Sequence, residues 1–126
     1  MTIDKLNEIA NRMVAPGKGI LAADESTASI TKRFESINLE STENNRRDYR
    51  EMLFRSTEAM KSCVSGVILF DETLRQKAAD GTPLVKLIKD AGAVPGIKVD
   101  KGPKPLPFSP GETVTEGLDG LAERVA

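Results

Sequence analysis

Apolar and polar residues follow one another in patterns that predict short helices separated by short buried strands. Near the amino terminus, apolar side chains recur at helical spacing at Ile3, Leu6, Ile9 and Met13. Pro16-Gly17 ends this pattern, so a leading amphipathic helix is expected within residues 1–16, with Thr2 as its cap. The run from Gly19 to Ala23 is apolar but too short for a helix, and it predicts a buried strand.

The longest predicted helix covers about residues 43 to 60. Thr42 is a good helix cap before it, and the apolar side chains of one face are Tyr49, Met52, Leu53 and Met60. Adjacent arginines such as Arg46 and Arg47 usually lie on a solvated helix face. A β-branched, apolar run over residues 64–70 then predicts a second buried strand.

The last third of the chain contains a helix, a strand and a proline-rich segment. Residues 84–91 predict a helix, and residues 93–100 predict a third strand in which Pro95 has no amide hydrogen to donate. Four prolines within residues 102–111 predict an extended loop. A short final helix is expected from Leu118 to Ala126.

Strands that alternate with helices and that are apolar on both faces predict a parallel sheet, so the expected fold class is α/β. The chain has 126 residues, the size of one domain. Three parallel strands leave two open edges, and the last helix has no glycine, asparagine or proline to end it. These features predict the front part of a larger α/β protein.

Composition excludes several classes of function. The chain has 18 Lys and Arg against 19 Asp and Glu, no Trp and one Tyr, which argues against a nucleic-acid partner. No histidine is present, which excludes mechanisms that need an imidazole. The apolar runs are too short to cross a membrane, and the amino terminus is unlike a signal peptide.

The single cysteine, Cys63, excludes an intrachain disulfide and a cysteine-based zinc site. It precedes an apolar run without a histidine or a cation beside it, so we expect a buried, unreactive thiol. This cysteine usage favours a reducing, cytoplasmic setting.

Asp24 and Lys98 are candidate functional residues because of their strand positions. Alternation places Asp24 on the face of Ala22, and it places Lys98 on the face of Asp100. A lysine in a buried strand is costly unless it faces a polar cavity or a partner, and the inner wall of a barrel offers such a cavity. Two structural alternatives remain: Lys98 pairs with Asp24 or Asp100 in the core, and Asp24 caps the next helix.

Hydroxyl side chains follow the first strand at Ser26, Thr27 and Ser29. They can bind a phosphate at a helix amino terminus, and equally they can cap that helix. Lys32-Arg33 lies near enough in sequence to help hold an anion. The glycine spacing around Lys18 does not fit a P-loop, so the sequence gives no support for nucleotide binding.

The segment from Gly17 to Thr27, GKGILAADEST, closely resembles the first strand of class I fructose-1,6-bisphosphate aldolases. Further matches to this family follow in the same order over nearly the whole chain, at ENNRR (43–47), GVILF (66–70), GIKVDKG (96–102) and GLDGL (117–121). Long motifs in a fixed order are far more specific than a lone glycine pattern.

The resemblance implies a TIM (β/α)8 barrel, of which this chain holds about three of the eight βα units. On this basis, residues 1–126 are one incomplete domain: residues 1–16 form a leading helix, and residues 17–126 form the first three strands and their helices. The family cleaves fructose 1,6-bisphosphate reversibly to dihydroxyacetone phosphate and glyceraldehyde 3-phosphate in glycolysis and gluconeogenesis. The family uses a lysine Schiff base without a metal or cofactor. The resemblance also implies that the full-length protein is a homotetramer.

Residue by residue, the resemblance implies a catalytic role for Asp24, at the hydroxyls of the bond being broken, and a phosphate contact for Lys98. Ser26 and Ser29 match phosphate-binding serines, and the matching charged positions nearby are Glu25, Lys32 and Arg33. The family's Schiff-base lysine lies on a later strand. The 126-residue polypeptide alone is therefore expected to be inactive.

The alternative is a non-catalytic product, which is a truncated isoform or half-barrel that binds a partner chain or a sugar phosphate through its open strand edges. The gene sequence past codon 126 separates the two hypotheses. A continuation into a lysine-bearing sixth strand supports the aldolase, and a stop codon supports the alternative.

Overall fold

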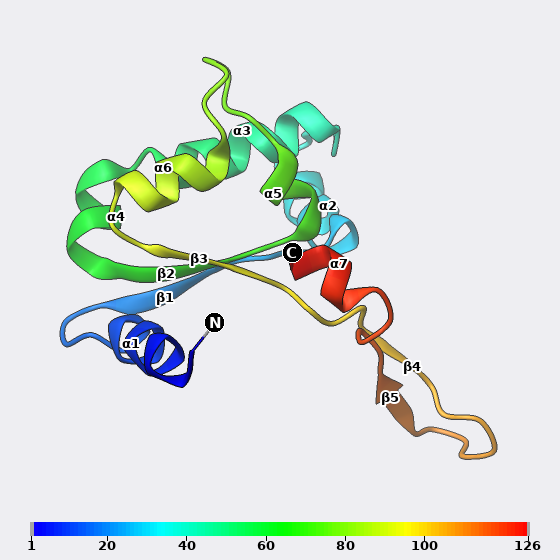
Figure 1. Cartoon of the computed structure of the whole chain (residues 1–126). Coiled ribbons are helices and arrows are strands. Elements are labelled where there is room, and N and C mark those ends of the chain that lie inside the picture. Colours follow the sequence, from blue (N-terminus) through cyan, green and yellow to red (C-terminus); the bar gives the residue numbers. More distant parts are fainter. Residues whose placement is uncertain (1, 126) are drawn as a thin grey trace.

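A three-stranded parallel sheet with the strand order β1-β2-β3 forms the centre of the computed structural model, which describes residues 2–125 (Figure 1). Its strands are β1 (Gly19–Ala23), β2 (Val64–Leu69) and β3 (Val94–Ile97). Ala23 pairs with Leu69, and Leu69 pairs with Ile97, so the carboxyl ends of the three strands lie in line. The predicted α/β class and the three predicted strands are confirmed.

The helices of the described residues are α1 (Ile3–Met13), α2 (Thr27–Glu35), α3 (Glu43–Phe54), α4 (Thr57–Cys63), α5 (Asp71–Arg75), α6 (Leu84–Asp90) and α7 (Leu121–Val125). Helices α3, α4 and α6 cover one side of the sheet, and α1 lies on the other side (Figure 1). Thr2 caps α1 as expected, accepting a hydrogen bond from the Lys5 amide.

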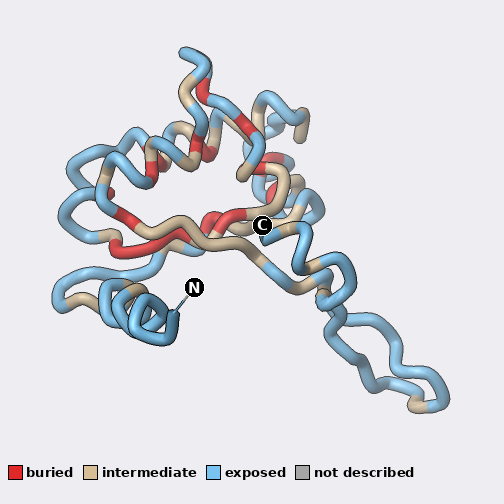
Figure 2. Tube along the Cα trace, viewed as in Figure 1, coloured by how far each residue is buried: buried red, intermediate tan, exposed pale blue. Residues whose placement is uncertain are grey.

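The hydrophobic core lies between the sheet and the three helices on its covered side (Figure 2). Its fully or almost fully buried side chains include Val67, Leu69, Phe54, Met60 and Ile88. The burial of these apolar side chains is the main force that holds the helices on the sheet. Because β2 is the central strand, it is the most deeply buried of the three.

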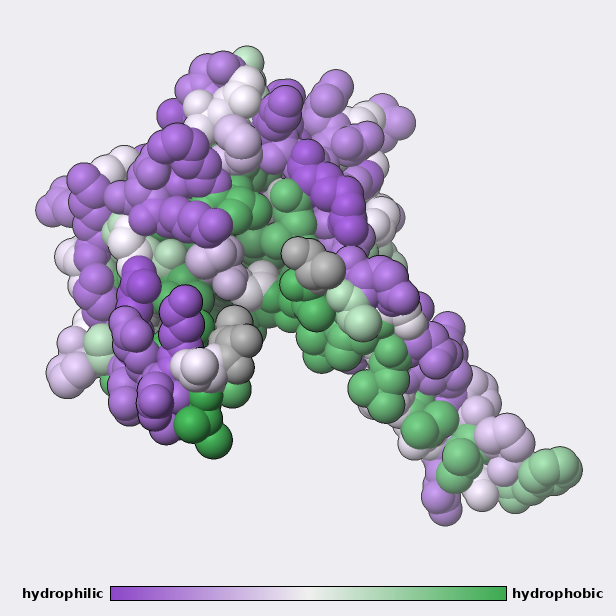
Figure 3. All heavy atoms as spheres, viewed as in Figure 1, coloured by the Kyte–Doolittle hydropathy of each residue, from purple (hydrophilic) through white to green (hydrophobic). Residues whose placement is uncertain are grey.

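The opposite side of the sheet is open among the described residues. Ile20 of β1 is 45% exposed, so among the described residues this strand is buried on one face only. Helix α1 is amphipathic as predicted, but it has no buried residue, and Ile3 and Leu6 are exposed. Figure 3 shows apolar side chains gathered in the hollow below the sheet, between α1 and the segment after β3.

The predicted helix over residues 43 to 60 is two helices, α3 and α4. The Ser56 hydroxyl donates to the Met52 carbonyl, and the Thr57 amide donates to the Arg55 carbonyl, so the regular helical bonding stops there. The buried face of α3 also differs from the predicted one. Met52, which was expected in the core, is 60% exposed, whereas Arg50 is fully buried.

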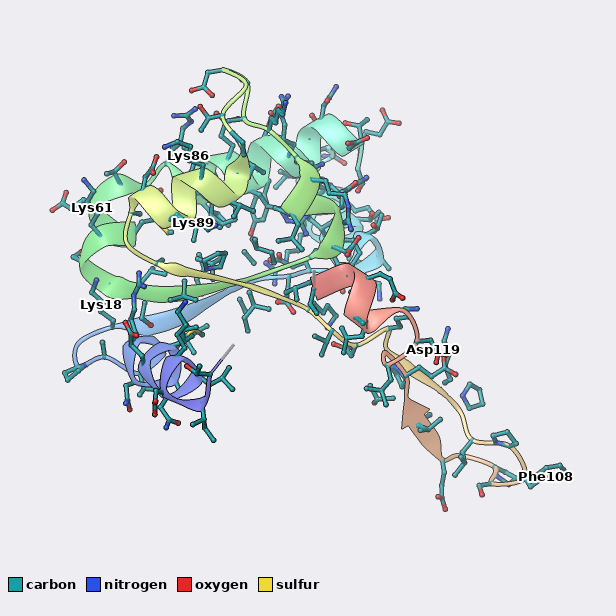
Figure 4. The ribbon with its side chains drawn as sticks, viewed as in Figure 1. Lys18, Lys61, Lys86, Lys89, Phe108 and Asp119 are labelled. Carbon is teal, nitrogen blue, oxygen red and sulfur yellow. The ribbon has the colours of Figure 1, made fainter. Side chains whose placement is uncertain are left out.

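Three further expectations are corrected. The predicted loop over residues 102–111 contains one arm of a hairpin, in which β4 (Pro103–Pro105) pairs with β5 (Thr113–Thr115). Phe108 lies fully exposed near its tip (Figure 4). Cys63 is exposed rather than buried. The last helix begins at Leu121 instead of Leu118, after a turn at Gly120, and its predicted end at Ala126 lies outside the described residues.

Two negative findings apply to residues 2–125. No helix there combines the length and the apolar character that a membrane crossing needs. Within the same range, His, Cys, Asp and Glu side chains form no group of three or more that could ligate a metal ion.

Candidate functional site

A cavity of about 840 Å³ opens at the carboxyl ends of the three parallel strands. Its lining comes from the segment after β1, from α2, from the ends of β2 and β3, and from α7. It includes six of the residues for which the sequence suggested a catalytic or binding role, namely Asp24, Glu25, Ser26, Ser29, Arg33 and Lys98, but not Thr27. Lys32 is exposed and is not part of the lining.

Lys98 lies between two carboxylates on the cavity wall. Its amide donates to the Leu69 carbonyl at 2.8 Å and so continues the parallel pairing of β3 with β2. The side chain places Nζ at 2.7 Å from Asp100 Oδ1 and at 3.7 Å from Asp24 Oδ2. The ion pairs expected for a structural lysine are therefore present. All three side chains remain between 25% and 38% exposed, so the group lies at the cavity and not in the core.

The charge state of Lys98 follows from these contacts. The hydrogen bond to Asp100 raises the pKa of the Lys98 ammonium, and the nearby Asp24 carboxylate adds to the rise. The same hydrogen bond lowers the pKa of the Asp100 carboxyl group. Lys98 therefore stays protonated at neutral pH and presents a positive charge to the cavity.

Ser26 is the amino-terminal cap of α2, since its Oγ accepts a hydrogen bond from the Ser29 amide at 3.3 Å. The hydroxyl oxygens of Ser26 and Ser29 lie 3.1 Å apart. The capping interpretation of the serine cluster is thus confirmed for Ser26, while both hydroxyls also line the cavity. The alternative in which Asp24 caps α2 is wrong, which leaves its carboxylate facing Lys98.

Arg33 contributes a second positive charge to the cavity wall. It donates to Glu25 Oε1 at 2.5 Å and to the Tyr49 hydroxyl at 3.4 Å. The Arg33 side chain is 60% exposed, whereas that of Glu25 is only 8% exposed. The nearly buried Glu25 carboxylate therefore holds one side of the Arg33 guanidinium, and the exposed part of the guanidinium remains available to an anion in the cavity.

A cluster of charged side chains formed by Arg46, Arg50 and Glu72 was missed by the sequence analysis. Arg46, expected on a solvated face, is only 12% exposed and donates twice to Glu72, at 3.0 and 2.6 Å. Its hydrogen bonds lower the pKa of the Glu72 carboxyl group. Arg50 is fully buried beside this pair. The available signal was the spacing of Arg46, Arg50 and Phe54, which places all three on one side of α3.

Arg124 of α7 is a second residue that the sequence did not point to. It donates to the main-chain oxygens of Lys98 at 2.8 Å and Val99 at 3.1 Å, and its Nε lies 3.4 Å from Asp71 Oδ1. These bonds fasten α7 to the end of β3, next to the cavity. No pattern in the sequence distinguishes Arg124 from other helical arginines.

Comparison with known proteins gives consistent results. Residues 5–126 match the model of a family described as fructose-bisphosphate aldolase class-I. Fructose-bisphosphate aldolase C of Carassius auratus is 62% identical over 122 residues, which are 97% of this chain and 34% of that protein. A probable fructose-bisphosphate aldolase class 1 of Xanthomonas campestris is 58% identical over 125 residues, which are 99% of this chain and 37% of that protein.

A solved structure is similar over the same extent. The fructose-bisphosphate aldolase of Plasmodium falciparum, described as a complex with TRAP and a small molecule inhibitor, superposes with a TM-score of 0.90 at 51% identity. The match covers 96% of this chain and 35% of that one. The chain thus spans about a third of the length of the relatives it matches.

Proposed function

Since the chain belongs to the class-I fructose-bisphosphate aldolase family, we propose that the protein containing it reversibly cleaves fructose 1,6-bisphosphate to dihydroxyacetone phosphate and glyceraldehyde 3-phosphate. The observation that carries the proposal is the meeting of Asp24, Lys98 and the two serines at one cavity. The family membership gives this cavity its substrate class. We further expect a cytoplasmic homotetramer.

The proposed fold of the whole domain is a (β/α)8 barrel, to which residues 1–126 contribute the leading helix and the first three βα units. Two observations support it. The sheet is parallel in sequential order, and its cavity lies at the carboxyl ends of the strands, where the active sites of such barrels lie. The open face of β1 then becomes the inner wall of the barrel, which later strands enclose.

Lys98 fits anion binding better than Schiff-base chemistry. An ammonium group has no lone pair with which to attack a carbonyl carbon, and the contacts with Asp100 and Asp24 favour that charged form. A protonated lysine attracts a phosphate dianion strongly. We therefore assign Lys98 to a substrate phosphate and place the imine-forming lysine outside residues 1–126.

Asp24 is assigned to the bond being broken. Its carboxylate lies on the cavity wall beside Lys98, so a phosphate held by Lys98 brings the adjoining carbon chain and its hydroxyl groups next to Asp24. A carboxylate at this place can accept a hydrogen bond from a hydroxyl and assist the removal of its proton. Asp24 is thus the catalytic residue proposed within this chain.

The substrate phosphate that lies farther from the Schiff base is assigned to Ser26, Ser29 and Arg33. The two hydroxyls line the cavity at the amino terminus of α2, where backbone dipoles favour negative charge. Arg33 adds a cation whose orientation is fixed by Glu25. Lys32 lies outside the cavity lining and is not assigned a contact.

The test uses the full-length gene product. We expect cleavage of fructose 1,6-bisphosphate that is insensitive to chelators, and inactivation by borohydride in the presence of dihydroxyacetone phosphate. Peptide mapping should place the trapped adduct on a lysine outside residues 1–126, and the 126-residue polypeptide should form no adduct. An adduct on Lys98 would refute the assignment, and an inactive full-length product would favour the non-catalytic alternative.

A further inference from the structure

We propose that Arg50 is a positioning residue that fixes the segment between β1 and α2, on which Asp24 and Ser26 lie. The inference rests on the proposed function for its activity readout, but the conformational readout below is independent of it. Arg50 does not line the cavity, so it does not contact a substrate there.

Arg50 joins segments that follow two different strands. Its Nη2 donates to the main-chain oxygen of Glu25 at 2.7 Å, in the β1–α2 segment. Its Nη1 lies 3.5 Å from Glu72 Oε2, and its guanidinium lies 5.7 Å from the centroid of the Phe70 ring. Glu72 and Phe70 follow β2, so one side chain on α3 contacts the ends of two neighbouring strands.

The burial of Arg50 has an energetic cost. The Arg50 side chain is completely buried, and its Nε and Nη1 have no hydrogen-bond acceptor. Burial lowers the pKa of its guanidinium, while Glu25 and Glu72 oppose this effect. An apolar side chain of similar size would fill the same space without the unpaired Nε and Nη1, but it would leave the Glu25 main-chain oxygen without its donor. The distinctive contribution of the arginine is therefore its directional bond to the Glu25 oxygen.

The hydrogen bond from Arg50 to the Glu25 oxygen lies in the segment that connects β1 to α2. The Glu25 carbonyl belongs to the peptide group between Glu25 and Ser26, so its orientation determines how the chain leaves Asp24 and enters the cap of α2. Helix α2 itself is held independently by the buried side chains of Ile30 and Phe34. Loss of Arg50 should therefore loosen the connecting segment while α2 stays in place.

The experiment compares R50M, R50K and the control R55M in the full-length gene product. Arg55 follows the same helix but pairs with Glu51 and Asp80 at the surface, and it is not part of the cavity lining. In R50M, hydrogen exchange at the Ser29 and Ile30 amides should rise at least about tenfold, while the β2 amides stay protected. R50K tests the same point if R50M does not fold, since it keeps the charge but loses the planar donor geometry.

The kinetic readout uses fructose 1,6-bisphosphate. Displacement of Asp24 and Ser26 should lower kcat/KM of R50M by about 10²-fold, with partial recovery in R50K and no change in R55M. Uniformly faster exchange over the whole domain, or unchanged exchange at Ser29 and Ile30, would overturn the proposal. If wild type lacks aldolase activity, the proposed function fails, and the exchange data alone still decide the role of Arg50.

Discussion

Asp24 and Lys98 approach each other at the carboxyl ends of β1 and β3, with 3.7 Å between Oδ2 and Nζ. The central strand β2 separates their backbones, so the two side chains lean toward one another across its end. This contact brings a carboxylate and an ammonium together at the mouth of the sheet. The contact is possible only because the strands are parallel and their carboxyl ends are in line.

Lys98→Met in the full-length protein should raise KM for fructose 1,6-bisphosphate. The loss of a charged donor to a phosphate costs about 1.5–3 kcal/mol, which corresponds to a rise of about 10- to 100-fold. Steady-state kinetics measure the effect. Lys89→Met serves as the control, since Lys89 is exposed on α6 (Figure 4). An unchanged KM in K98M would contradict the phosphate assignment.

Asp24→Asn preserves the size of the side chain and removes its charge. If Asp24 assists proton transfer, kcat should fall by about 10²- to 10⁴-fold, with a smaller effect on KM. Asp100→Asn is the matched comparison, since Asp100 also contacts Lys98. Equal losses in both variants would mean that Asp24 acts only as a charge partner of Lys98.

Asp80 makes acid stability depend on pH in a defined window. Hydrogen bonds from Thr82 and Arg55 lower the pKa of its carboxyl group from 3.8 to about 2. A lowered folded-state pKa means that the stabilisation is fully present above pH 3.8 and is lost as the pH falls toward about 2. The midpoint temperatures of thermal unfolding of wild type and Asp80→Asn should therefore converge as the pH falls through this window. A difference between the two midpoints that does not change with pH would exclude a contribution of the Asp80 carboxylate to stability.

Gly66→Ala tests how α1 is held on the sheet. An added Cβ would lie 2.8 Å from Met13 Cε and 3.3 Å from the Val94 oxygen, so Met13 has to move. Because the end of the flexible Met13 side chain can move, the cost should lie at the lower end of the range for overpacking, about 1 kcal/mol, measurable as a lower midpoint of chemical unfolding. Met13→Ala should remove most of that penalty in the double variant. An additive loss would show that the Val94 backbone, and not Met13, is the obstacle.

Much of the fold could be predicted from local patterns. The spacing of apolar residues predicted α1 and α6, because burial of one helix face requires a regular repeat. Short continuous apolar runs predicted β1, β2 and β3. The break at Ser56 was missed because the apolar pattern continues through it. The hairpin of β4 and β5 was missed because its prolines suggested a loop, although Lys104 between them keeps an amide to donate.

The candidate site was predicted in part. Asp24 and Lys98 stood out as charges in apolar strands, and the serines stood out as a polar cluster before a helix. Arg50 did not stand out, because an arginine on a helix is usually solvated and only the packing of α3 against the strand ends buries it. Arg124 was missed because two of its partners are main-chain oxygens, which carry no sequence signal.

The order of the three central strands, the parallel α/β class and the family could be predicted from the sequence, since these depend on short-range periodicity and on motifs that follow one another in a fixed order. Which charged side chains meet depends on tertiary packing. The pairing of Lys98 with Asp100 and Asp24, the anchoring of Arg33 by Glu25 and the burial of Arg50 join residues from different elements. Their distances follow from strand register and helix packing, which no local pattern specifies.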